Sequence, residues 1–168
     1  MQIYTREAVF LDSLEGFVSG GLLAGEAVIV IATAHHRQEL QDRLARRGIF
    51  LVEPRAQSRY IDLDADETLA LFMVDGLPDA GRFSSVVSDL MTRARGADRK
   101  VRAFGEMVAI LWARGNEIAT FELEKLWHGE CEARGFSLFC AYPRNGFSRD
   151  GDAAIERICS SHSQSLLA

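Results

Sequence analysis

Two adjacent histidines, His35 and His36, follow a short run of β-branched and small residues, Ala27 to Thr33. A non-alternating apolar run of this kind is typical of a strand that is buried on both faces. The helical pattern that comes next predicts the first half of a βαβ unit. In an open α/β sheet, ligands bind at the carboxyl ends of the strands, where the following helices begin. We therefore expect one of the two histidines to contact a ligand or an anion there. The alternative is an exposed residue in the first turn of the helix.

The loop after this strand lacks the residues that usually hold a phosphate group. A phosphate-binding loop would place Gly-x-x-x-x-Gly-Lys-Ser/Thr at this position. No glycine and no lysine occur between Glu26 and Gly48. The pattern therefore favours a nucleotide-binding type of architecture without its phosphate cradle.

Glu106 is an acidic residue within an otherwise apolar segment, Phe104 to Met107. Acids near such strand ends hold magnesium or activate water in RecA-type ATPases. The alternative is a structural ion pair with Arg102 or Arg59, because a buried carboxylate needs a partner in either case. Without a lysine and glycines to hold phosphates, we favour a ligand-orienting or structural role over catalysis. No catalytic triad can be assembled with any specificity, and we expect no enzymatic activity.

The polar residues near the ends of the predicted strands are candidates for one shared pocket. We expect one of the histidines to line it together with the other members of the set: His35, His36, Arg59, Tyr60, Arg102, Glu106 and Tyr142. If the histidine contacts the ligand while neutral, binding should weaken as the pH falls through about 6.5, the pKa of an unperturbed imidazole.

Two helical pairs offer nitrogen and sulfur ligands for a metal, namely His128-x-x-Cys131 and Cys159-x-x-His162. Residues three apart lie on one helix face, and the four side chains are of the types that zinc prefers. Zinc motifs rarely come as two separate helical pairs, and a buried cysteine beside a surface histidine is commoner. We therefore expect no metal and no cofactor.

Length and composition limit the class of protein. The 168 residues suit one domain, 1–168, and 48% hydrophobic residues with 10 Phe provide a sizeable core. The formal net charge of -5 gives no basic footprint for direct nucleic-acid binding. Three widely spaced cysteines argue for a reducing compartment. The first residues form neither a signal peptide nor a membrane span, so we expect a cytoplasmic, soluble protein.

Strand-like and helix-like segments alternate along the chain. The patterns predict strands over 27–33, 49–52, 59–63, 100–107 and 136–142, and helices over 6–23, 36–47, 65–74, 82–95, 108–113, 117–134 and 152–163. Asp64-x-x-Glu67 predicts a capping box at the start of the helix over 65–74, Asn116 predicts the cap of the helix over 117–134, and Gly48 predicts the end of the helix over 36–47. This alternation predicts an α/β fold with a doubly wound, mostly parallel sheet and helices on both of its faces.

Several blocks resemble one family, the MEDS domain, which is the sensory domain of the regulator DcmR and of methanogen and methylotroph proteins. The matching blocks include GEAVIVIATAHHRQEL, VRAFGEMVAILWARGNEIATFELEKLW and FSLFCAYP, and the similarity covers nearly the whole chain. The resemblance implies a fold related to the RecA and KaiC ATPases with the phosphate-binding loop lost. It also implies recognition of small organic compounds such as hydrocarbon derivatives.

The family resemblance also implies an output partner. Family members attach this domain to DNA-binding or histidine-kinase partners, and this chain lacks the DNA-binding segment of DcmR. We therefore expect a small organic ligand and a histidine kinase or regulator protein as partners. We also expect ligand binding to change the order of residues 143–163. The alternative function is a residual nucleotide-binding protein or ATPase of the KaiC type, which the missing glycine-lysine loop disfavours.

Overall fold

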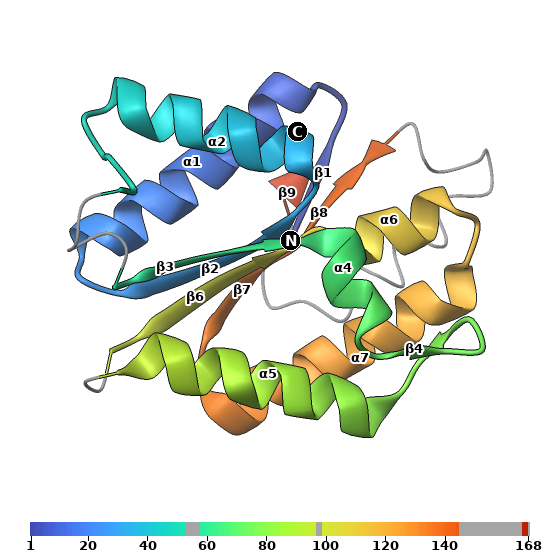
Figure 1. Ribbon diagram of the computed structural model, residues 1–168. Coiled ribbons are helices and arrows are strands. Elements are labelled where there is room, and N and C mark those ends of the chain that lie inside the picture. The colour runs from blue at the N-terminus through green and yellow to red at the C-terminus, as the bar shows by residue number, and fades with distance from the viewer. Residues whose placement is uncertain (53–57, 97–98, 145–165, 168) are drawn as a thin grey trace.

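A four-stranded, fully parallel sheet forms the centre of the protein. The computed structural model describes residues 1–52, 58–96, 99–144 and 166–167 (Figure 1). The strand order is β3 (Tyr60–Asp64), β2 (Ala27–Ala32), β6 (Val101–Gly105) and β7 (Ser137–Phe139). In this register, Ile29 of β2 lies between Ile61 of β3 and Ala103 of β6.

A second, three-stranded parallel sheet continues from the first. Its order is β8 (Ala141–Pro143), β1 (Gln2–Tyr4) and β9 (Leu166–Leu167). The sequence predicted one strand over 136–142, which is wrong, because the segment divides at Cys140. Residues before Cys140 pair with β6, whereas those after it pair with β1, and the carbonyl of Cys140 accepts a hydrogen bond from the Gln2 N–H at 2.8 Å.

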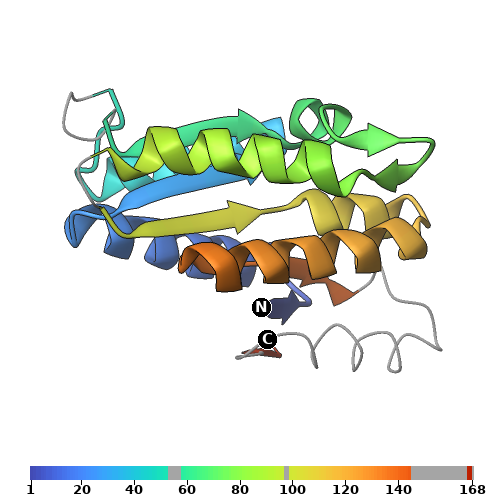
Figure 2. The same ribbon diagram turned by 90° about the horizontal axis from the view of Figure 1, so that it is seen from below.

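Helices cover both faces of the central sheet, as predicted (Figures 1 and 2). One face carries α1 (Glu7–Leu23) and α2 (Ala34–Arg46), and the other carries α5 (Ala80–Arg95) and α7 (Glu117–Arg134). Strand β2 alternates between the two layers: Val28, Val30 and Ala32 pack toward α1 and α2, and Ala27, Ile29 and Ile31 pack toward α5 and α7. Every residue of β2 is buried, which explains its continuous apolar run.

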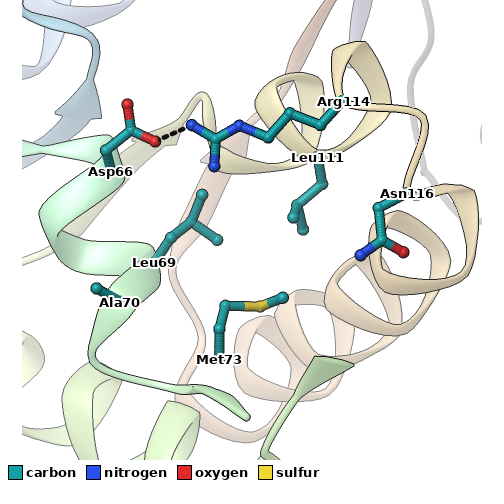
Figure 3. A pocket seen from close by; sticks show the side chains of 7 residues that line it. All are labelled: Asp66, Leu69, Ala70, Met73, Leu111, Arg114 and Asn116. Atoms are coloured by element: carbon teal, nitrogen blue, oxygen red, sulfur yellow. Dashed lines mark hydrogen bonds and ion pairs between the residues drawn. The ribbon is translucent and has the colours of Figure 1, made fainter. Parts of the chain in front are cut away.

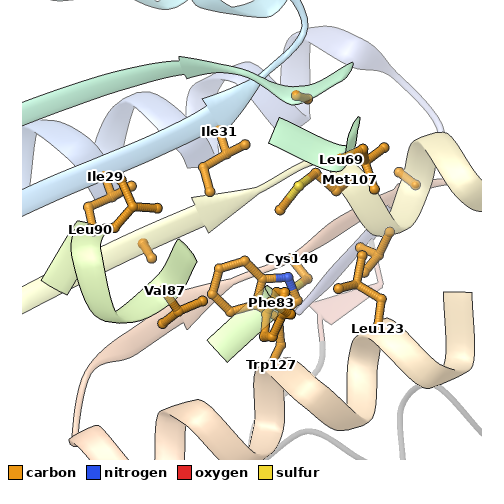
Figure 4. Packing of buried hydrophobic residues seen from close by; sticks show 14 of the residues in the cluster. Ile29, Ile31, Leu69, Phe83, Val87, Leu90, Met107, Leu123, Trp127 and Cys140 are labelled. Carbon is orange, nitrogen blue, oxygen red and sulfur yellow. The ribbon is translucent and has the colours of Figure 1, made fainter. Parts of the chain in front are cut away.

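The core beneath α5 and α7 is rich in aromatic side chains (Figure 4). Phe83 of α5 meets Trp127 of α7 edge to face, with ring centroids 4.9 Å apart, and Phe72 packs against Phe83 in the same manner at 5.1 Å. Edge-to-face pairs place the positive ring edge against the negative ring face, which fixes both helices on the sheet.

Three shorter elements gather beyond the carboxyl ends of the strands. They are α4 (Ala65–Ala70), the hairpin of β4 (Met73–Val74) and β5 (Leu77–Pro78), and α6 (Met107–Ala113). Asp64 caps α4 by accepting hydrogen bonds from the N–H groups of Asp66 and Glu67, which the sequence pattern predicted. The predicted helix over 65–74 ends early, because the segment after Ala70 turns into the hairpin.

The predicted strand over 49–52 does not form. Gly48, with φ 75°, ends the preceding helix as expected, but residues 49–52 follow as an irregular segment. Both edges of β2 are already occupied by β3 and β6. The apolar side chains Ile49 and Leu51 pack instead against the cluster below α1 and α2.

The described helices include none that is long and apolar enough to cross a bilayer. The segment 143–163, whose order we expect ligand binding to change, lies outside the described residues from position 145 onward, as do the predicted helix over 152–163, Cys159 and His162.

Candidate functional site

The strand order creates a topological switch point between β2 and β6. The chain passes from β2 to β3 on one side and then crosses to place β6 on the other side of β2. The connections that leave the carboxyl ends of β2 and β6 therefore run in opposite directions, and such switch points are where open α/β sheets bind ligands. Thr33 follows β2 directly, and Glu106 follows β6 directly.

Glu106 is fixed at this point by both strands. Its backbone N–H donates to the carbonyl of Ile31 at 2.9 Å, and its carboxylate oxygen Oε2 accepts a hydrogen bond from the Thr33 N–H at 2.8 Å. The predicted alternative, an ion pair with Arg102 or Arg59, is wrong, because the partner of Glu106 is a histidine. Its Oε1 lies 2.7 Å from Nδ1 of His36.

His36 lies between two carboxylates from different elements. Its second ring nitrogen, Nε2, is 2.9 Å from Oε1 of Glu7, the first residue of α1. The same Glu7 oxygen is 3.2 Å from Nε2 of His35. His36 and Glu106 are buried, whereas His35 and Glu7 are exposed, so the cluster opens to solvent on one side.

The charges of this cluster shift its pKa values. Burial is the largest influence on His36 and lowers its pKa, but hydrogen bonds and charge interactions with Glu106 and Glu7 outweigh it and leave the pKa raised. The hydrogen bond from His36 lowers the pKa of Glu7. Burial, with Glu106 and Glu7, raises the pKa of Tyr4 to about 12.

Aromatic rings form the buried side of the cluster. Phe10 meets the His36 ring edge to face at 5.0 Å, and Tyr4 stacks on Phe10 at 4.8 Å. Sequence reasoning missed Glu7 and Tyr4, because β1 has only three residues and was not predicted. An acidic residue at the start of a predicted helix was the only sequence signal for Glu7. This signal did not point to the site, because the position of β1 beside α2 could not be predicted.

Three of the predicted pocket residues lie at the opposite edge of the sheet, so the prediction of one shared pocket was wrong for them. Arg102 pairs with Glu26 and lies over the ring of Phe17, 5.4 Å from its centroid. Arg59 donates from Nη1 to the carbonyl of Leu22 at 2.9 Å. Arg102 precedes Glu106 by four residues of a strand, which separates them by about 13 Å along a parallel sheet.

The two predicted tyrosines do not join the histidine cluster either. Tyr60 begins β3 at the same amino edge; its hydroxyl is buried and finds no hydrogen-bond partner among the described residues. Tyr142 lies in β8 within the core below α7, where its hydroxyl donates to Glu124. Burial raises the pKa of both tyrosines.

A pocket of about 370 Å³ lies between α4, β4 and α6 (Figure 3). Its walls combine apolar side chains with polar groups, which are an ion pair between Asp66 and Arg114 and the amide of Asn116; the complete lining is Asp66, Leu69, Ala70, Met73, Leu111, Arg114 and Asn116. Because α4 and α6 begin at the carboxyl ends of β3 and β6, this pocket shares the edge of the sheet with the histidine cluster.

Sequence reasoning identified the caps of the helices around this pocket but not the pocket itself. Asn116 was predicted as a cap, and its Oδ1 accepts from the Ala119 N–H at 3.1 Å. Its amide nitrogen also donates to the carbonyl of Gly76 at 2.8 Å, which ties α7 to the β4–β5 hairpin. No local sequence pattern predicts that long-range contact. None predicts that α4 and α6 lie on opposite sides of the pocket either.

The candidate metal ligands separate into two groups. His128 is exposed and lies 3.3 Å from Glu132, and burial raises the pKa of the Cys131 thiol to about 12. Their predicted partners, Cys159 and His162, lie outside the described residues. Glu7, His35 and His36, in contrast, place three potential ligand atoms within 4.8 Å of one another.

Comparison with protein families identifies the chain. The model of the MEDS family, "MEthanogen/methylotroph, DcmR Sensory domain", matches residues 1–163, and the chain belongs to this family. No curated protein sequence matches it. The predicted relationship to RecA and KaiC remains a prediction.

Proposed function

We propose that this chain is a non-catalytic sensor that binds a small organic molecule in the pocket between α4, β4 and α6. Membership of a sensory family supports a sensing role in general. The observation that carries the finer proposal is the pocket itself, which brings apolar side chains together with an ion pair and an amide at the carboxyl edge of the sheet. In small-molecule pockets, apolar side chains contact the ligand and a few polar groups fix its orientation.

The size and lining of the pocket favour a small ligand that has both an apolar part and a polar or halogen substituent. Its volume of about 370 Å³ is near the lower end of the range of about 300–1,000 Å³ that is usual for ligand pockets. Leu69 and Leu111 are buried, and the Met73 side chain lies alongside them (Figure 3). A hydrocarbon derivative, with one polar or halogen substituent near Asn116 or Arg114, fits this chemistry.

The lining favours binding without turnover. The pocket-lining residues include no Ser, Cys, His or Lys, and their one carboxylate, Asp66, is held in an ion pair with Arg114. A general base or nucleophile would have to come from another part of the chain.

The neighbourhood of α2 argues against the alternative of a nucleotide-binding protein. A phosphate at the start of this helix would need the backbone N–H groups and the positive end of the helix dipole. Glu106 already accepts the Thr33 N–H, and Glu7 places a second carboxylate beside His35 and His36. Two carboxylates at this position repel a phosphate group.

Output requires a partner that recognises the liganded state. A ligand in the pocket touches both α4 and α6, and it shifts their arrangement only to the extent that it binds two arrangements with different affinity. We propose that a histidine kinase or a transcription regulator reads this difference. Hydrogen exchange with and without bound compound tests it: protection should increase in residues 65–74 and 107–116.

Thermal denaturation with a panel of small compounds tests ligand binding. The panel starts with dichloromethane, methanol and short alkyl alcohols and halides, and at least one should raise the melting temperature in proportion to its concentration. Ala70→Trp places a large ring at the exposed edge of the pocket and should abolish the shift. Ala45→Trp, at an exposed position of α2 on the other face of the sheet, is the matched control and should retain it.

Calorimetry with ATP and magnesium tests the alternative function. Micromolar ATP affinity, or ATP turnover above background, would contradict the sensor proposal. The Ala70→Trp variant shows where any ATP binds. ATP affinity that is unchanged in this variant would place the nucleotide near α2, whereas reduced affinity would place it in the pocket.

A further inference from the structure

The hydrogen-bonding pattern around His36 requires a cation. Both ring nitrogens of His36 face carboxylate oxygens, with Nδ1 2.7 Å from Glu106 and Nε2 2.9 Å from Glu7. A neutral imidazole has one N–H donor and one lone pair. When Nδ1–H donates to Glu106, the lone pair of Nε2 points at Glu7 Oε1, which is itself an acceptor. Either a second proton or a metal ion must lie at this position.

His35 also faces the Glu7 oxygen that contacts His36. Its Nε2 lies 3.2 Å from the same Glu7 oxygen. Two imidazole nitrogens and one carboxylate oxygen, from two helices, therefore converge on one point, with all three atoms within 4.8 Å of one another. A single hydrogen bond uses two atoms, whereas a metal ion uses all three.

In contrast to the expectation of no metal from the sequence, we propose that Glu7, His35 and His36 form a binding site for a divalent transition-metal ion, with zinc as the preferred ion. Imidazole and carboxylate ligands suit zinc and its neighbours in the first transition row. The site goes beyond the proposed sensor function and does not rest on it, because its residues lie outside the organic-ligand pocket.

The distances suit such an ion after small side-chain movements. Ligand atoms about 2.0–2.1 Å from a tetrahedral zinc lie about 3.3 Å from one another. The Glu7 oxygen is 2.9 Å from His36 and 3.2 Å from His35, so these two pairs need to open by less than about half an ångström. The two imidazole nitrogens lie within 4.8 Å of one another, and rotation of the exposed His35 side chain adjusts that third distance. Glu7 and His35 are exposed and able to move, and their exposure also gives the ion a path from solvent.

Glu106 supplies the support that metal-bound histidines usually have. A ligating histidine commonly donates its other N–H to a carboxylate, which fixes the ring and its tautomer. Glu106 occupies this position toward His36 and is itself held by the Thr33 N–H at 2.8 Å. The buried half of the site is therefore rigid, and Phe10 packs edge-on against the His36 ring.

Three protein ligands leave a fourth coordination position open. Sites of this kind bind water or a small oxygen, nitrogen or halide donor at that position. The Glu7 and Glu106 carboxylates also balance the charge of a divalent ion, which offsets the unfavourable positive end of the α2 dipole.

Cobalt titration of protein stripped with a chelator tests the site without any organic ligand. We expect the protein to bind one Co²⁺ per chain and to show visible absorption bands that disappear when zinc replaces the cobalt. Zinc should also raise the melting temperature. Glu7→Gln and His35→Ala remove exposed ligands and should each weaken zinc binding at least tenfold while leaving the circular dichroism unchanged. Glu106→Gln should weaken it about 10- to 100-fold.

His128→Ala is the matched control, because His128 is an exposed helical histidine beside a glutamate that lies outside the cluster. It should bind zinc as the wild type does. No metal binding by the wild type would show that the cation at His36 is a proton and would overturn the proposal. Equal binding by the Glu7→Gln/His35→Ala double variant, or loss of binding in His128→Ala, would assign the metal elsewhere and overturn it as well.

Discussion

The two edges of the central sheet carry similar polar side chains but use them differently. At the amino edge, Arg102 pairs with Glu26, and Arg59 binds the carbonyl that ends α1. At the carboxyl edge, His36 faces two carboxylates, and a pocket lies nearby between α4 and α6. At the amino edge, polar side chains connect helix ends to strand starts, whereas at the carboxyl edge they place a histidine between two carboxylates, beside a pocket.

This difference follows from the direction of a parallel sheet. Every strand of the central sheet enters at the same edge and leaves at the other. Helix N-termini, with their free N–H groups, therefore collect at the carboxyl edge, together with the switch point between β2 and β6. A charged residue acts in the site only if it lies at the correct end of its strand.

The largest predicted difference between the edges concerns Glu106 and Glu26. Glu106→Leu removes the acceptor for both the Thr33 N–H and His36 and should reduce the free energy of unfolding by about 2–4 kcal/mol. Glu26→Leu breaks a partly exposed pair with Arg102 and should cost less than about 1 kcal/mol. Urea denaturation of both variants measures the difference, and equal losses would contradict the contrast between the edges.

Sequence patterns predicted the carboxyl-edge half of this contrast better than the amino-edge half. The strand over 27–33 and the positions of His36 and Glu106 followed from a buried apolar run and from an acid near the end of an otherwise apolar strand segment, although the predicted strand over 100–107 included Glu106 and the observed one ends at Gly105. Arg102 and Tyr60 were assigned to the same pocket because the prediction did not distinguish the amino end of a strand from its carboxyl end. The sequence order gives the direction of each strand, but the distance between the two ends depends on the length of the strand.

The remaining features depend on contacts that no local pattern encodes. The division of the last predicted strand at Cys140 depends on β1, which pairs with β8 over three residues. The pocket depends on how α4 and α6 face one another. Helix caps such as Asp64 and Asn116 were predictable, because each bonds to residues two or three positions away.

Two glycines of α1 test how closely this helix packs against the amino edge of the sheet. A Cβ at Gly21 would lie 2.9 Å from Val28 Cγ2 and 3.0 Å from Arg102 Cδ, whereas a Cβ at Gly16 would meet nothing within 4 Å. Gly21→Ala should lower stability by about 1 kcal/mol, because overpacking exceeds the gain in helix propensity. Gly16→Ala should raise stability by up to about 1 kcal/mol.

Thermal or urea denaturation of these two variants provides the measurement. The predicted effects have opposite signs although both substitutions are glycine to alanine in one helix. Stabilisation by Gly21→Ala would show that α1 does not pack closely against β2 and Arg102.

The smallest predicted effect concerns the polar rim of the pocket. Arg114 and Asp66 form an ion pair whose side chains are 56% and 58% exposed. Arg114→Gln should therefore change the free energy of unfolding by less than about 0.5 kcal/mol. A loss above about 2 kcal/mol would assign this pair a structural role and weaken its interpretation as part of a binding pocket.

Methionine-methyl NMR tests the central claim most directly. The chain has four methionines. Met73 lines the pocket, and Met91 lies on the buried face of α5. Titration with the panel of small hydrocarbon derivatives should shift the Met73 methyl signal and leave that of Met91 unchanged. The shift should disappear in Ala70→Trp and persist in Ala45→Trp. A Met73 signal that no compound shifts, or a shift that survives Ala70→Trp, would contradict a sensor that binds its ligand between α4, β4 and α6.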